Sequence, residues 1–122
     1  MIENSFLKKM ADYSYERVLK AKKLESEAEL IKIVKKNMPP PIVLKNQFNI
    51  IAEIKKRSPA KGILQNSNFS LEEQLKSYAS ACPMAISILT EPEAFNGSLA
   101  DLSFAAKIMN KYKIPVMRKD FL

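Results

Sequence analysis

The fold of this chain is decided by residues 51–62, which read Ile-Ala-Glu-Ile-Lys-Lys-Arg-Ser-Pro-Ala-Lys-Gly. The segment begins as an apolar strand and then breaks into a turn at Ser58. Because alternate residues of a strand point to the same side, we expect Glu53 and Lys55 to share one face, with Ile54 on the other. The hydroxyl, lysines and backbone amides of the turn are groups that bind anions. The segment therefore predicts a strand that leads into an anion-binding turn.

The composition is that of a small globular chain with a basic balance. It has 122 residues, of which 47% are hydrophobic and 27% charged, and its formal net charge is +7. This length is enough for one small domain. The basic residues are spread along the chain without aromatic residues between them, so we do not expect nucleic-acid binding. A small anionic metabolite needs only a few of these charges.

The chain has no histidine and a single cysteine, Cys82. A Ser-His or Cys-His nucleophile cannot form, so acid–base chemistry falls to Lys, Glu, Asp or Tyr. One cysteine also excludes an internal disulfide and a cysteine-rich zinc site. Because Cys82 precedes Pro83 at the start of a predicted strand, we expect a buried or half-buried structural thiol. The N-terminus has no long apolar run, so we expect no membrane partner and a cytoplasmic location.

Residues 1 to about 36 predict a helical arm. Asn4 or Ser5 can cap its first helix, and a second helical piece covers residues 25–36. Three prolines at 39–41 then follow, and prolines cannot continue a helix. We therefore predict an N-terminal helical extension and a proline linker over residues 1–47.

From residue 48 the pattern changes to alternating strands and helices. Strands are predicted at 48–55, 84–89 and 114–119, and helices at 71–80 and 98–111, with Ser70 and Ser98 as N-caps. This order predicts a parallel sheet, either open and doubly wound or closed into an eight-stranded barrel. In both, ligands bind at the carboxyl ends of the strands. The polar residues gather there: Glu53, Lys55, Ser58, Ser87, Thr90, Glu91 and residues 118–120.

Three segments together resemble one known family. They are residues 51–62 (IAEIKKRSPAKG), 86–102 (ISILTEPEAFNGSLADL) and 114–122 (IPVMRKDFL). In order and spacing they are similar to the first three strand motifs of indole-3-glycerol phosphate synthase, and the helical arm matches that family's extension before its barrel. The resemblance implies an α/β fold of the (β/α)₈ TIM barrel type, with only the first three βα units present over residues 48–122.

The resemblance also implies a reaction. The family converts 1-(2-carboxyphenylamino)-1-deoxyribulose 5-phosphate to indole-3-glycerol phosphate in tryptophan biosynthesis, with loss of CO₂ and water and with no metal or organic cofactor. Lys119 matches the general acid for ring closure. Lys55 matches the lysine that engages the carboxylate and phosphate region of the substrate, and Glu53 a glutamate that pairs with it and helps in proton transfer. The structural alternatives are an interior ion pair for Glu53 and Lys55 and a solvated charge for Lys119.

Four further positions match substrate-binding positions of the family. Ser58 matches a phosphate contact on the first loop, and Ser87 an inward-facing strand position beside the site. Phe95 and Phe121 match apolar positions near the aromatic ring of the substrate. For Phe95 the structural alternative, a loop phenylalanine that covers a helix end, has nearly equal weight.

The length of the chain leaves more than one interpretation open. The family's barrel needs eight strands and roughly 250 residues, whereas this chain ends at Leu122. We therefore expect the 122-residue chain alone to lack useful activity, and its partners to be a phosphorylated small molecule and a complementary C-terminal half-barrel. The alternative is a truncated or split-gene product with a structural or interaction role. A third interpretation is another phosphate-binding barrel, such as phosphoribosylanthranilate isomerase. The Glu-Ile-Lys-x-x-Ser-Pro motif argues against this interpretation.

Overall fold

The structure, a computed structural model, describes residues 5–45 and 47–121. It divides into two compact units. The first is formed by the two N-terminal helices together with Phe121, and the second by Val43–Asp120.

The first helix of the N-terminal unit is α1 (Phe6–Leu24). The Ser5 hydroxyl accepts a hydrogen bond from the backbone N–H of Lys8 at 3.2 Å, so the predicted cap at Ser5 is confirmed. The other predicted cap, Asn4, lies outside the described residues. Met10 is the buried residue of this helix.

The second helix is α2 (Glu27–Asn37), and it begins with a capping box. The Ser26 hydroxyl accepts from the Glu29 N–H at 3.3 Å, and the Glu29 carboxylate accepts from the Ser26 N–H at 3.2 Å. No side chain is buried among the residues of α2, all of which the structure describes. The predicted second helix is thus present, and local hydrogen bonds define its start.

The second unit alternates strands and helices, as predicted. Its elements are β1 (Ile51–Ile54), β2 (Arg57–Ser58), β3 (Gly62–Ile63), α3 (Leu71–Ser80), β4 (Ala85–Leu89), α4 (Leu99–Asn110) and β5 (Val116–Lys119). The sheet order is β1-β4-β5, and both pairs of neighbours are parallel. The predicted α/β class with a parallel sheet is confirmed. The predicted N-terminal extension of the first strand to residue 48 is wrong, because β1 starts at Ile51.

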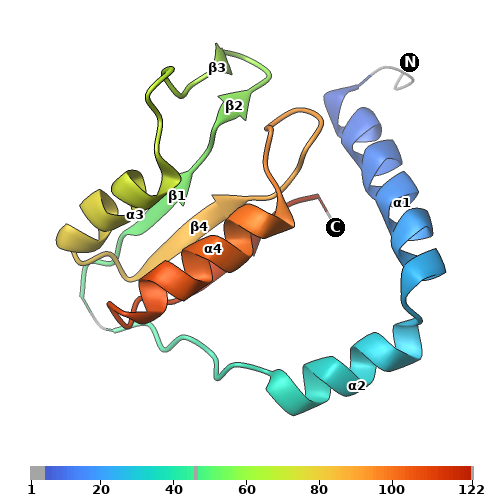
Figure 1. Cartoon of the computed structure of the whole chain (residues 1–122), viewed down its shortest axis with the longest axis horizontal. Helices are drawn as coiled ribbons and strands as arrows, with labels where there is room; N and C mark the ends of the chain where they lie inside the picture. The colour runs from blue at the N-terminus through green and yellow to red at the C-terminus, as the bar shows by residue number, and fades with distance from the viewer. Residues whose placement is uncertain (1–4, 46, 122) are drawn as a thin grey trace. The chain divides into compact units, whose positions relative to one another are not determined.

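The two helices α3 and α4 pack on one face of the sheet. Figure 1 shows α3 beside β1 and α4 across β4. The core between them contains Ile54 of β1, Ile86 and Ile88 of β4, Leu75 and Ala79 of α3, and Ala105, Ile108 and Met109 of α4. Because side chains alternate along a strand, Glu53, Ser87 and Met117 point to the opposite face. The helix layer thus determines which strand residues are left for a site.

Two local features differ from the sequence-based expectation. β2 and β3 form a short antiparallel hairpin that the sequence did not predict. Cys82 is exposed, so its predicted burial is wrong. Cys82 has a backbone φ of 50° and donates its N–H to the Ala79 carbonyl at 3.0 Å. It therefore forms the turn after α3, and such turns lie at the surface.

None of the helices in residues 5–45 and 47–121 combines the length and the apolar character needed to cross a membrane.

Candidate active site

The register of the sheet arranges the predicted residues in two rows on the face opposite the helices. Glu53 pairs with Ser87, and Ser87 pairs with Met117. One pleat further toward the carboxyl ends, Leu89 pairs with Lys119. Lys55 follows the last paired residue of β1 and continues this second row. Because neighbouring strands lie about 4.8 Å apart, the backbones at Lys55 and Lys119 are separated by about 10 Å.

The side chains of Glu53 and Lys55 form an ion pair. Lys55 Nζ lies 3.2 Å from Glu53 Oε1, and the two side chains are 35% and 32% exposed. A pair with this exposure contributes at most about 1 kcal/mol to stability, because water screens the charges. The Tyr78 hydroxyl of α3 donates to the Glu53 carbonyl at 3.2 Å and so ties the backbone at this point to the helix layer. The pair is accessible to a ligand.

Ser87 lies in the middle of the central strand and is buried. Within the described part of the chain, its hydroxyl oxygen has no hydrogen-bond partner. A buried hydroxyl without a partner costs about 1–3 kcal/mol. Ser87 therefore has an unused hydroxyl on the face of the sheet opposite the helices.

Ser58 stands in the hairpin that follows β1. Its hydroxyl accepts a hydrogen bond from the backbone N–H of Lys61 at 3.2 Å, and Gly62 has a φ of 67°. The serine thus organises the tight turn in which it lies. The hydroxyl can still donate its own proton to an anion, because the hydrogen bond from Lys61 uses only its acceptor side.

Lys119 ends β5 between two residues that form a polar cluster with Thr90. The Thr90 hydroxyl donates to Asp120 Oδ2 at 2.7 Å and accepts from Arg118 Nε at 3.1 Å. Arg118 Nη2 lies 3.0 Å from the same Asp120 oxygen, and the Asp120 side chain is only 2% exposed. The Thr90 N–H also donates to the Lys119 carbonyl at 2.9 Å. The backbone on both sides of Lys119 is therefore fixed, while its side chain is exposed.

A second ion pair joins the end of β1 to the start of α4. Lys56 Nζ lies 2.6 Å from Asp101 Oδ2, and both side chains are mostly buried. Asp101 also donates its N–H to the capping hydroxyl of Ser98 at 3.0 Å. This pair links the segment after β1 to the first turn of α4, and the loop that leads into α4 contains the half-buried Phe95.

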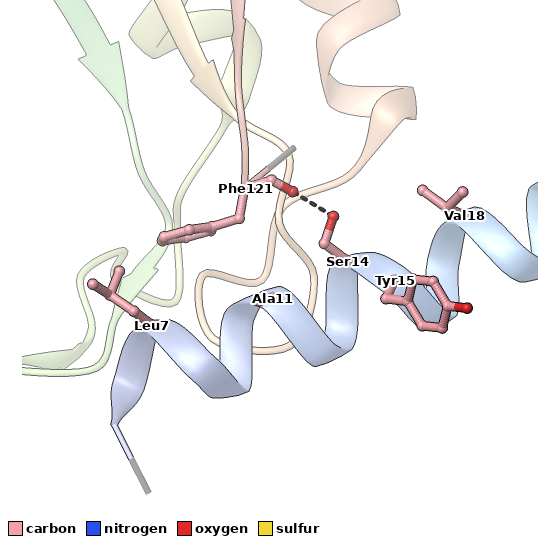
Figure 2. Close-up of a pocket in the computed structure, with 6 residues that line it drawn as sticks. All are labelled: Leu7, Ala11, Ser14, Tyr15, Val18 and Phe121. Atoms are coloured by element: carbon pink, nitrogen blue, oxygen red, sulfur yellow. Dashed lines mark hydrogen bonds between the residues drawn. The ribbon is translucent and has the colours of Figure 1, made fainter. Parts of the chain in front are cut away.

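Phe121 belongs to the N-terminal unit, where it packs on α1. Its ring meets that of Phe6 edge-on, with centroids 6.0 Å apart. Figure 2 shows the Ser14 hydroxyl donating to the Phe121 carbonyl at 2.6 Å. An open and mainly apolar pocket of about 560 Å³ is lined by Leu7, Ala11, Ser14, Tyr15, Val18 and Phe121. Phe121 is thus part of the lining of a mainly apolar pocket.

The structure brings Glu53, Lys55, Ser87 and Lys119 to one face of the sheet, and it places Ser58 in the β2–β3 hairpin after β1 and Phe95 in the loop after β4. The sequence predicts polar groups at Thr90 and at residues 118–120 but indicates no separate role for Thr90, Arg118 or Asp120. Their arrangement around Lys119 could have been anticipated, because a threonine and an aspartate follow two neighbouring parallel strands.

Comparison with known proteins gives consistent matches. The family model described as "Indole-3-glycerol phosphate synthase" matches residues 5–122. An "Indole-3-glycerol phosphate synthase" of Aquifex aeolicus (strain VF5) is 46% identical over 72 residues, which are 59% of this chain and 26% of the relative. Relatives with the same description in Nautilia profundicola and Campylobacter hominis are 47% identical over 78 residues and 43% identical over 75 residues. These matches cover 63% and 62% of this chain, but only 28% and 27% of the relatives.

Proposed function

The chain belongs to the indole-3-glycerol phosphate synthase family, and from this premise we propose that it supplies the first part of that enzyme's site. It spans little more than a quarter of the length of the curated relatives it matches. The proposed reaction is ring closure, decarboxylation and dehydration of 1-(2-carboxyphenylamino)-1-deoxyribulose 5-phosphate to indole-3-glycerol phosphate, as a carboxy-lyase. The proposed fold of the whole enzyme is the eight-stranded barrel, and its proposed location is the cytoplasm.

The observation that carries the proposal is the register of the sheet. Parallel strands place their carboxyl ends at one edge, which is where α/β barrels bind ligands. Leu89 pairs with Lys119, and Lys55 continues the same row. Two lysine ammonium groups therefore flank one stretch of the sheet face, as a substrate with a carboxylate and a phosphate requires.

Lys119 is the proposed general acid. Ring closure makes the ketone oxygen of the substrate basic, and an ammonium group near it can donate a proton. The Thr90–Asp120 hydrogen bond supports this role, because it holds the backbone next to Lys119 while the lysine side chain stays exposed. A fixed backbone and an available ammonium group are what proton transfer at a defined atom needs.

Glu53 and Lys55 are proposed to act together. Lys55 attracts the carboxylate and phosphate region of the substrate, and Glu53, 3.2 Å from the ammonium group, accepts or relays a proton. Because the pair is only loosely held, a substrate anion can replace Glu53 as the partner of Lys55. The glutamate is then free to act on the substrate.

The remaining positions are proposed to bind the substrate. Ser58 and the turn after β1 contact the phosphate, and the unpartnered hydroxyl of Ser87 donates a hydrogen bond beside the reacting atoms. Phe95 and Phe121 contact the aromatic ring. We also propose that residues 1–47 form the extension before the barrel and residues 48–122 its first three βα units. The remaining units would come from a complementary C-terminal half-barrel.

A chimera tests the proposal. Residues 48–122 replace the matching segment of the Aquifex aeolicus relative, and formation of indole-3-glycerol phosphate is followed by absorbance and fluorescence. We expect an active chimera, and a loss of at least about a hundredfold in kcat for Lys119→Met, as is usual when an acid–base group is removed. The control is Lys107→Met, which removes an exposed lysine of α4 and should leave kcat within about twofold.

The 122-residue chain is assayed in parallel, alone and mixed with the C-terminal part of the relative. Activity only in the mixture supports the half-barrel proposal. An inactive but folded chimera would refute the catalytic proposal and favour a structural or interaction role. Full activity of the Lys119→Met chimera would remove Lys119 from the mechanism.

A further inference from the structure

The loop between β4 and α4, residues 92–97, is organised by one side chain. Glu91 Oε1 accepts from the N–H of Glu93 at 3.0 Å. Its other oxygen, Oε2, accepts from the N–H groups of Ala94 at 2.7 Å and Phe95 at 3.1 Å. Glu91 is the second residue after β4 and is completely buried. A buried carboxylate with this many donors is stabilised by charge-assisted hydrogen bonds.

The backbone of Glu91 and its neighbours completes the arrangement. The Gly97 N–H donates to the Glu91 carbonyl at 2.9 Å, and the Asn96 N–H donates to the Pro92 carbonyl at 3.2 Å. Pro92 has no N–H. Every backbone N–H of this loop, all of which the structure describes, therefore has an acceptor, and four of the five donate to Glu91.

Three successive N–H groups that converge on one point form the kind of concave site that binds phosphate. Such sites are common in the loops that follow strands of a parallel sheet. Here the protein's own carboxylate occupies this position. The loop thus has the geometry of an anion site but offers no free amide to an anion from solution.

We propose that Glu91 is a positioning residue that acts as an internal anion for this loop. It fixes the backbone of Phe95 and keeps substrate phosphate out of the β4–α4 loop, so that phosphate binds elsewhere along the carboxyl edge. The contact of Phe95 with an aromatic ring and the exclusion of substrate phosphate both rest on the proposed function. The assignment of Glu91 as the internal anion does not.

The close approach of the loop to the strand supports this role. A Cβ atom at Gly97 would collide with the backbone carbonyl of Leu89. The end of the loop at Gly97 therefore packs directly against the backbone of β4, which leaves little room for an alternative loop conformation. Glu91 holds one end of this path through its side chain and the other end through its carbonyl.

The test uses amide signals of the 122-residue chain in ¹H–¹⁵N NMR spectra, with sodium acetate and inorganic phosphate as probes. In the unmodified chain we expect no response of the Ala94 and Phe95 amides to either anion. In Glu91→Ala the vacated position should bind acetate, so both amides should shift with a saturable dependence on acetate concentration. Rescue by a free carboxylate is a result that a purely packing role for Glu91 would not give.

A second variant keeps the shape of the side chain and removes its charge. In Glu91→Gln we expect hydrogen exchange of the Ala94 and Phe95 amides to become at least about tenfold faster, because a neutral amide oxygen is a weaker acceptor than a carboxylate. Glu93→Gln is the matched control, since it removes an exposed carboxylate from the same loop and should leave exchange unchanged.

Unchanged exchange in Glu91→Gln would overturn the proposal, as would a response of the Ala94 or Phe95 amide to phosphate in the unmodified chain. None of these readouts needs catalysis. Their failure would leave the proposed function standing, and an inactive chimera would leave the role of Glu91 standing.

Discussion

α2 and α4 are helices of nearly equal length, with 11 and 12 residues, and each begins at a serine cap. α4 buries Ala105, Ile108 and Met109 in the core of the sheet unit. α2 buries no side chain, although it carries aliphatic residues at helical spacing. It has instead a complete capping box, acidic residues in its first turn and lysines in its last, which suit the helix dipole. Apolar periodicity therefore indicates a helix in both cases, but only in α4 does packing against the sheet add stability.

The largest expected effect comes from matched isoleucine substitutions in the two helices. Ile108→Ala in α4 removes a side chain that is 8% exposed, and we expect it to lower the free energy of unfolding by about 2–5 kcal/mol. Ile33→Ala in α2 removes one that is 49% exposed and should change it by about 0.5 kcal/mol or less. Urea titrations followed by circular dichroism and by NMR give both values. Equal losses would contradict the distinction between the helices.

The next largest effect on stability is expected at Gly97, just before α4. Gly97→Ala introduces a Cβ atom against the rigid backbone of Leu89, and we expect a loss of about 3 kcal/mol, the upper part of the range for overpacking. Gly62→Ala is the control. At Gly62 the new Cβ atom meets open space, and only the left-handed φ of 67° opposes the substitution. We therefore expect the free energy of unfolding to fall by about 1 kcal/mol. A milder effect at Gly97 than at Gly62 in the same urea titration would show that the loop can move away from β4.

The caps distinguish local from tertiary stabilisation. Ser98→Ala removes the acceptor for the Asp101 N–H, and we expect about 1 kcal/mol less stability for the whole sheet unit. Ser26→Ala removes a cap of similar strength from α2, where the expected result is loss of helical structure confined to its first turn. Carbon chemical shifts along both helices measure the difference. Fraying of α4 alone, with no change in the unfolding of the sheet, would contradict the expectation for Ser98.

The smallest expected effect is a change in the pKa of the Glu29 carboxyl group. Hydrogen bonds from the Ser26 side chain and backbone lower the pKa of Glu29 below its usual value of 4.5. A lowered pKa in the folded state means that this contribution is present above pH 4.5 and is lost as the pH falls through the folded-state pKa. NMR titration of the Glu29 carboxyl group should show the lowered pKa, and Ser26→Ala should raise it toward 4.5. A Glu29 pKa that Ser26→Ala leaves unchanged would mean that the capping box is not formed in solution.

The sequence predicts the second unit well where a residue's own chemistry defines an element. α3 occupies residues 71–80 as predicted, because Ser70 caps it and the turn at Cys82 ends it. α4 starts after its predicted cap, Ser98. β4 has apolar residues on both faces, as is typical of a central parallel strand, and all its residues, including Ser87, are buried. These elements depend on local signals or on a continuous apolar run, both of which are visible in the sequence.

The parts that were missed depend on contacts between distant residues. The hairpin of β2 and β3 has strands of only two residues, too short for an alternating pattern. The cluster of Thr90, Arg118 and Asp120 forms only when β4 and β5 are in register. Glu91 reads in the sequence as one more charge in a loop, and only the folded loop shows that it is buried. For the candidate site, the sequence indicated the strand ends but not which side chains fix them.

The turn at Cys82 has a practical consequence. This exposed thiol precedes β4, whereas Thr90 and Glu91 follow it, so the two ends are separated by the length of the strand, about 17 Å for five residues. A fluorophore or spin label attached at Cys82 would report on the chain at one defined point, remote from the edge where a ligand is proposed to bind. Because the sequence contains no other cysteine, such labelling needs no prior mutation. The chain thus carries its own attachment point for testing whether it assembles with the proposed C-terminal half-barrel.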